Sequence, residues 1–134
     1  MFIGTDLVHV PSFAEQLHTP GSAFATKVFS ALELRVAATK PDRDAHLAGR
    51  WAAKEAFIKA WSQTLYGSAP VISADKVDWR EIEIVPDAWG RVVVTLRGEI
   101  QRLAQLGQAH ISISHDRDYA IAQCLIPDAE ELRL

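Results

Sequence analysis

Hydrophobic and polar residues alternate along several short segments of the chain, and this period of two predicts β-strands. The clearest case is the first segment, Phe2 to Val8, in which small or polar residues separate apolar ones. Segments of the same kind recur in the second half of the chain: Val77 to Val85, Arg91 to Leu96, His110 to Ser114 and Tyr119 to Leu125. Polar turns between consecutive members of this set indicate hairpins, so we expect an antiparallel sheet.

Apolar residues three or four positions apart predict the helices. The longest helix is expected from about Asp44 to Tyr66, ending before Gly67. Shorter helices are expected over residues 11–17, 31–38 and 98–106, and Ser30 and Glu33 have the spacing of a capping box. This order of elements predicts an α+β fold, with an antiparallel sheet packed on a long central helix, in one domain of residues 1–134.

Composition narrows the function classes. The 134 residues suit one domain, and Lys and Arg (14) do not outnumber Asp and Glu (17), which argues against a nucleic-acid-binding surface. No apolar run reaches the roughly 20 residues of a membrane span, and no secretory signal is evident. The single cysteine, Cys124, is expected to be a buried structural thiol. These features favour a cytoplasmic protein without membrane or nucleic-acid partners.

The long helix is apolar on two sides, so we expect it to be packed on two sides. One stripe contains Ala52, Ala53, Ala56, Phe57 and Ala60, and the other contains Leu47, Trp51, Ile58 and Leu65. Arg50 and Lys54 occupy one seam between the stripes, and Glu55 and Lys59 occupy the other. In a chain this short, the neighbour of the second stripe could be another subunit.

Charged residues of the second seam can form a site with Asp6. Glu55 and Lys59 stand one helical turn apart, which taken alone is more often a surface ion pair. Asp6 shares one face of the first strand with Phe2, Gly4 and Val8, and a charge there needs a partner or a metal unless it is a solvated strand end. Asp6 and Glu55 together offer the hard oxygen ligands that Mg²⁺ accepts beside phosphate.

The segment His110 to His115 places hydroxyls and an imidazole near a strand end. Ile111 and Ile113 are expected to face the core, whereas Ser112 and Ser114 line the opposite face and His115 opens the turn. Such groups can bind phosphate, although an ordinary solvated strand face has the same pattern. The chain contains no P-loop, no dinucleotide-binding glycine fingerprint and no zinc-ligand spacing.

These segments resemble the bacterial holo-[acyl-carrier-protein] synthases, of the 4′-phosphopantetheinyl transferase family, and in particular their actinobacterial members. The matching motifs follow the family order: Gly4-Thr5-Asp6-Leu7-Val8, Phe24 to Glu33, Leu47 to Ala60 with its Lys54-Glu55…Lys59 core, Asp87 to Arg91, and Ile111 to His115. Each motif is weak alone, and the five together, across nearly the whole chain, are specific.

The resemblance implies a fold, a reaction and a set of roles. Phosphopantetheine would pass from coenzyme A to a serine of an acyl carrier protein, or of the carrier domain of a fatty acid synthase, with release of 3′,5′-ADP. Asp6 and Glu55 would hold Mg²⁺ and act with Lys59 in catalysis, while Arg50, Lys54, Lys59 and His115 would bind coenzyme A. The resemblance also implies a homotrimer with active sites between subunits, working in fatty acid biosynthesis.

Three positions depart from the family pattern. Pro11-Ser12-Phe13 replaces a segment that usually carries a basic residue for the carrier protein, and Lys27 or Arg35 could substitute for it. His9 and Val92 stand where glutamate and proline are common. Two other functions would use the same residues: a Mg²⁺-dependent pyrophosphate hydrolase of nucleotides, and a trimeric binding module without enzymatic activity.

Overall fold

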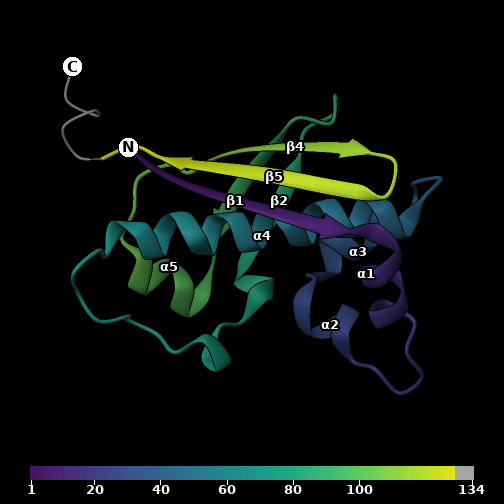
Figure 1. The fold of residues 1–134 in the computed structure, drawn as a ribbon, viewed down its shortest axis with the longest axis horizontal. Helices are drawn as coiled ribbons and strands as arrows, with labels where there is room; N and C mark the ends of the chain where they lie inside the picture. Colours follow the sequence, from purple (N-terminus) through teal and green to yellow (C-terminus); the bar gives the residue numbers. More distant parts are fainter. Residues whose placement is uncertain (129–134) are drawn as a thin grey trace.

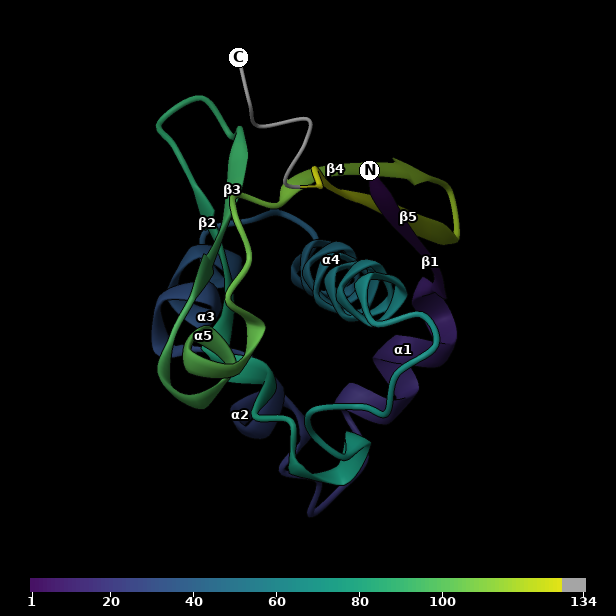
Figure 2. The ribbon, with the colours of Figure 1, turned by 90° about the vertical axis from the view of Figure 1, so that its left-hand side faces the viewer.

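The long helix α4 (Arg43–Thr64) lies at the centre of the molecule, and other elements pack around it in the computed structural model, which describes residues 1–128 (Figure 1). Viewed along its axis, α4 has a three-stranded sheet on one side and a two-stranded sheet on another (Figure 2). The strands are β1 (Phe2–His9), β2 (Ile82–Pro86), β3 (Val92–Leu96), β4 (His110–Asp116) and β5 (Tyr119–Ile126). The remaining helices are α1 (Val10–Leu17), α2 (Phe24–Val28), α3 (Ala31–Ala38) and α5 (Gly98–Ala104), with 3-10 helices η1 (Ala74–Lys76) and η2 (Trp79–Glu81). The α+β prediction is confirmed.

The larger sheet joins the two ends of the described chain. Its strand order is β1-β5-β4, and both pairs are antiparallel, with Gly4 opposite Cys124 and Asp6 opposite Ala122. Strand β1 can lie close to α4 because Gly4 has no side chain. A Cβ at position 4 would overlap the carbonyl oxygen of Ala56 and lie 2.6 Å from the nitrogen of Ala60. This close approach brings the Asp6 side of β1 against the helix.

The predicted alternation of the first and last strands is confirmed. In β1, residues 4, 6 and 8 are buried and residues 3, 5 and 7 are exposed. In β4, Ile111 and Ile113 are half-buried against the core, while Ser112 and Ser114 are exposed. Cys124 is fully buried, and desolvation raises the pKa of its thiol to about 12, as expected for an inert structural cysteine.

Both apolar stripes of α4 contact other elements of the same chain, although Trp51, Ile58 and Leu65 of the second stripe stay partly exposed. The ring of Trp51 contacts the rings of Phe24 and Trp79, with centroids 5.5 and 4.7 Å away. Leu47 of the same stripe is fully buried. The sequence shows that this face is apolar, and the partners of Trp51 are contributed by α2 and η2, which were not predicted.

The segment before β2 differs from the prediction of a strand from Val77 to Val85. Only Ile82 onward is a strand, because the carboxylate of Asp78 accepts the backbone N–H of Arg80 and turns residues 79–81 into η2. The capping box that begins α3 is confirmed, since Ser30 and Glu33 each accept the backbone N–H of the other. Within residues 1–128, no helix combines the length and the apolar character that crossing a membrane requires.

Candidate active site

Asp6, Glu55 and Lys59 meet where β1 crosses α4, as the sequence predicts. The ammonium nitrogen Nζ of Lys59 donates to Oδ1 of Asp6 at 2.9 Å and to the carbonyl oxygen of Thr5 at 3.1 Å. The side chain of Asp6 is only 9% exposed, whereas that of Lys59 is 55% exposed. The cluster therefore has a buried carboxylate at its base and a solvent-facing cation at its rim.

Glu55 is the group in this cluster with the most perturbed acidity. Burial raises the pKa of its carboxyl group, and the facing carboxylate of Asp6 raises it further, to about 7, against an opposing effect of Lys59. Two carboxylates that face each other repel when both are ionised, so one retains a proton near neutral pH. A cation held between the two would replace that proton.

One oxygen atom of Asp6 shows that the cluster is incomplete as it stands. Oδ2 is buried and has no hydrogen-bond donor among the described residues, whereas Oδ1 is bound by Lys59. A buried, unpaired carboxylate oxygen is costly, and it is satisfied either by the proton shared with Glu55 or by a metal ion. Residues 1–128 contain no group of three or more His, Cys, Asp and Glu side chains placed for a metal. Two carboxylates nonetheless fit Mg²⁺, which keeps water and phosphate oxygens as its other ligands.

The raised pKa of Glu55 predicts how pH changes the stability of the metal-free protein. The unfolded chain loses this proton near pH 4.5 and the folded chain near pH 7, so between these values the folded state binds more protons. Stability should therefore fall as pH rises from about 5 to 7. Thermal unfolding in EDTA should show this fall, and Glu55→Gln should remove its part of it. An equal fall in the Glu55→Gln variant would contradict the assignment.

A second polar site lies on another side of α4, under β4. Arg50 and His115 line a cavity of about 410 Å³ together with residues 90–92 and 111–113. The imidazole nitrogen Nε2 of His115 lies 2.9 Å from the carbonyl oxygen of Ala45, and the ring lies where a side chain at Gly49 would be. The predicted pair of Arg50 and His115 is thus brought together, away from Glu55.

His46 belongs to this second site, and the sequence analysis missed it. Its Nε2 is buried without a hydrogen-bond partner among the described residues. Burial, together with the nearby Arg50, Lys40 and His115, lowers the pKa of its imidazole to about 4. A lone histidine at the start of a helix gives no signal in the sequence. In the structure it lies among cations, so an anion is the natural partner for this group.

Lys54 has a role other than the predicted contact with coenzyme A. Its side chain is fully buried, and its ammonium group binds Glu33 and two backbone carbonyls, leaving no surface for a ligand. Arg50 and Lys54 lie on the same seam of α4, as predicted. The ammonium group of Lys54, however, is covered by η2 and β2. We therefore leave it out of the substrate site.

Two neighbouring hollows lie along one side of α4, and together we call them the furrow. Its wide part, of about 730 Å³, is lined by Phe24 and Lys27 of α2, Trp51 and the segment 74–80. Its narrower, apolar part, of about 260 Å³, is lined by Ile58, Trp61, Leu65 and residues 68–77. Ala74 and Val77 border both parts. By helical geometry Glu55 is about one turn from both Trp51 and Ile58, so it lies at the edge of the furrow, although it is not among the lining residues.

Comparisons with known proteins identify the family of the chain. Residues 2–124 match the model of the 4′-phosphopantetheinyl transferase superfamily. A holo-[acyl-carrier-protein] synthase of Corynebacterium glutamicum is 55% identical over 130 residues, which cover 92% of this chain and 96% of that protein. One from Mycobacterium ulcerans is 46% identical over 125 residues, which cover 92% and 94%.

Solved structures give the same result. A complex described as Chronobacterium ammoniagenes ACPS-CoA matches with a TM-score of 0.88 and 56% identity, over 93% of this chain and 95% of that one. The Mycobacterium tuberculosis acyl carrier protein synthase matches with a TM-score of 0.74 and 38% identity, over 94% and 97%. By fold and sequence, the chain belongs to the holo-[acyl-carrier-protein] synthase family of 4′-phosphopantetheinyl transferases.

Proposed function

We propose that the protein transfers 4′-phosphopantetheine from coenzyme A to a serine of an apo acyl carrier protein, or of a carrier domain of a fatty acid synthase, and releases 3′,5′-ADP. The observation that carries this proposal is the pair of a buried Asp6, with one unsatisfied oxygen, and a half-buried Glu55, beside the exposed side chain of Lys59. The family membership supports the same reaction. The whole chain would form one domain working in the cytoplasm, in fatty acid biosynthesis.

Each residue of the pair has a role that follows from its place. Asp6 and Glu55 would hold Mg²⁺, which when bound neutralises charge on the pyrophosphate of coenzyme A. The ammonium group of Lys59 is held by Asp6 while the side chain stays open to solvent, so it can bind phosphate oxygens as a point charge. Glu55 is one candidate for the proton acceptor of the incoming serine hydroxyl, although its pKa of about 7 belongs to the metal-free pair.

Arg50, His115 and His46 would bind the 3′-phosphate of coenzyme A. We expect His46→Ala to raise the KM for coenzyme A by about tenfold, because one donor to an anion is lost. The KM for dephospho-coenzyme A, which lacks that phosphate, should change little. Steady-state kinetics with both substrates tests this, and His18→Ala, at an exposed histidine of α1, is the matched control. Equal losses with both substrates would place the 3′-phosphate elsewhere.

A homotrimer with active sites between subunits is the assembly that we propose. The outer face of the larger sheet supports it, because Leu7 and Ile121 lie opposite each other and are 61% and 39% exposed. Ile3 and Tyr119 extend this apolar patch. The two polar sites also lie on different sides of α4, so a neighbouring subunit could bring one to the other. Lys27, on the wall of the furrow, is a candidate contact for the carrier protein.

The patch gives a direct test of the assembly. Leu7→Asp should yield a smaller species by multi-angle light scattering, because a charge buried at an interface costs several kcal/mol. Val93→Asp is the control, since Val93 is a similarly exposed apolar residue on β3, outside the patch. An unchanged mass for Leu7→Asp would remove the sheet face as the interface.

The transferase can be separated from the hydrolase and from the binding module by following 3′,5′-ADP. The transferase releases it from coenzyme A only when an apo carrier protein is present. The hydrolase would turn over its nucleotide substrate without a carrier, and a binding module would release nothing. Chromatographic detection of 3′,5′-ADP with and without the carrier protein distinguishes the three outcomes.

A further inference from the structure

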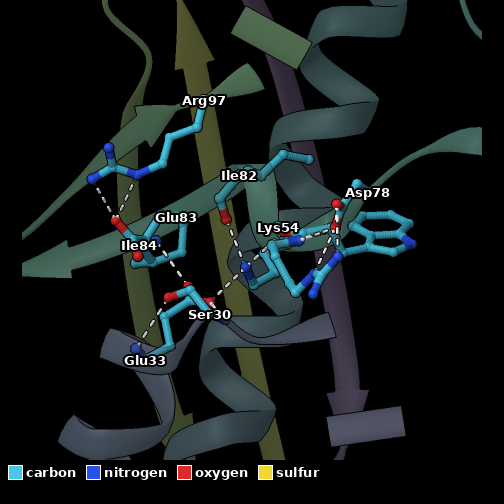
Figure 3. A network of polar contacts seen from close by, with 10 residues as sticks. Ser30, Glu33, Lys54, Asp78, Ile82, Glu83, Ile84 and Arg97 are labelled. Atoms are coloured by element: carbon cyan, nitrogen blue, oxygen red, sulfur yellow. Dashed lines mark hydrogen bonds and ion pairs between the residues drawn. The ribbon is translucent and has the colours of Figure 1, made fainter. Parts of the chain in front are cut away.

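Lys54 and Glu33 form a completely buried ion pair that connects four elements, α3, α4, η2 and β2 (Figure 3). The ammonium nitrogen of Lys54, on α4, donates to Oε1 of Glu33 at 2.8 Å and to the carbonyl oxygens of Trp79 and Ile82 at 2.8 and 2.6 Å. Glu33, on α3, accepts the backbone N–H of Ser30 at 2.8 Å and of Ile84 at 2.9 Å. The pair thus fixes both ends of the Trp79–Ile82 segment relative to α4.

Stability alone does not account for this pair. Removing two charges from water is so costly that replacing a buried ion pair with apolar side chains is often neutral or stabilising. What the ions provide here is directionality, since four of their contacts are hydrogen bonds to backbone groups of α3, η2 and β2. Apolar side chains could fill the same volume but could not hold those carbonyl and N–H groups in place.

The segment held by Lys54 forms the aromatic wall of the furrow. The ring of Trp79 packs against Trp51 at 4.7 Å, with the ring planes at 63°, and both residues line the wide part of the furrow. Trp51 lies one helical turn before Glu55 on the same side of α4. A shift of the Trp79 backbone would therefore change the space next to the proposed transfer site without touching Asp6, Glu55 or Lys59.

We propose that Glu33 and Lys54 are positioning residues for the transfer reaction: they hold the Trp79–Ile82 segment against α4 and so fix the aromatic wall of the furrow beside Glu55. Neither residue contacts a reacting group. They act through Trp79 on how a substrate lies in the furrow. This inference rests on the proposed function for its kinetic consequence, whereas the arrangement of Trp51 and Trp79 can be measured without any activity.

The test uses the full-length protein and a variant that removes both charges, Glu33→Gln with Lys54→Met. Removing only one would leave the other charge buried and unpaired, and could unfold the protein. The KM for coenzyme A or for the carrier protein should rise by about tenfold, while kcat stays within about threefold of wild type. The near-ultraviolet circular dichroism that arises from the Trp51–Trp79 contact should weaken. Glu83→Gln is the control, because Glu83 is a buried acid of the same region that pairs with Arg97 and does not bind Lys54.

The second variant to be tested is Trp79→Ala. Its circular dichroism spectrum shows how the protein behaves without the Trp51–Trp79 contact. The substitution leaves the ion pair intact and removes the wall, so it should raise the same KM. The inference would be overturned if the charge-free variant kept both the KM values and the spectrum of the wild type. It would also be overturned if Trp79→Ala kept the wild-type KM values. If the charge-free variant does not fold, Trp79→Ala decides. An inactive wild-type protein would contradict the proposed function instead, and the spectra would still report on the wall.

Discussion

Glu55→Gln is expected to lower the rate of phosphopantetheine transfer by roughly a thousandfold, the loss typical of removing one group that stabilises transition-state charge. The amide keeps the size and position of the side chain but provides one weaker, neutral oxygen. Asp6→Asn should have a comparable effect, because Asp6 provides the only buried carboxylate oxygen in the described cluster that lacks a donor. The transfer rate measured over a range of Mg²⁺ concentrations would show whether the loss reflects metal binding.

Stability and activity should change in opposite directions in the Glu55→Gln variant. At pH 8 Glu55 is ionised, and its repulsion by Asp6 and its partial burial destabilise the folded protein, as its raised pKa indicates. The neutral variant lacks this destabilisation and should melt at or above the wild-type temperature. Glu99→Gln is the matched control, because Glu99 forms an exposed ion pair with Arg102 whose loss changes little. A Glu55→Gln enzyme with near-normal transfer in Mg²⁺ would contradict the assigned metal site.

Gly4→Ala should cause a large loss of stability, about 3 kcal/mol or more. The new Cβ would overlap the Ala56 carbonyl oxygen and lie 2.6 Å from the Ala60 nitrogen, and both atoms belong to the backbone of α4. Strand β1 would have to move away from the helix and take Asp6 with it. Urea denaturation gives the free energy of unfolding, and the transfer rate should fall in any folded fraction.

Gly21→Ala separates this steric effect from ordinary backbone strain. Gly21 has a φ of +76°, and its missing side chain would meet no atom within 4 Å. The left-handed conformation of an alanine costs roughly 1 kcal/mol, so this variant should lose clearly less stability than Gly4→Ala. Similar losses at positions 4 and 21 would mean that β1 does not need its close approach to α4.

Periodicity accounts for the parts of the site that could be predicted. The period of two in β1 places Asp6 on the buried face with Gly4 and Val8, and the period of 3.6 in α4 places Glu55 and Lys59 on one seam. Neither pattern states which element covers a seam. The identification of the site as a place where β1 meets α4 therefore came from the unusual charge of Asp6 together with the family motifs.

The contacts that were not predicted have a common cause: the pattern of one element does not show which residues pack against it. Arg50 and Lys54 share a seam, but the partners of Lys54 come from Glu33 and from residues 79 and 82, far along the chain. The neighbours of Trp51 come from Phe24 and Trp79, in short helices whose formation depends on local caps such as Asp78. His46 carries no pattern at all, because its significance lies in what surrounds it. The periodicity of one helix or strand cannot predict tertiary contacts of this kind.

The central claim is the reaction itself, and intact-mass spectrometry of an apo carrier protein tests it most directly. The carrier protein would be incubated with this protein, coenzyme A and Mg²⁺, with EDTA and Glu55→Gln as parallel controls. We predict a gain of one phosphopantetheine group on the carrier, blocked by EDTA and nearly absent with Glu55→Gln. No gain on several carrier proteins, from a folded protein that binds coenzyme A, would contradict the transferase assignment.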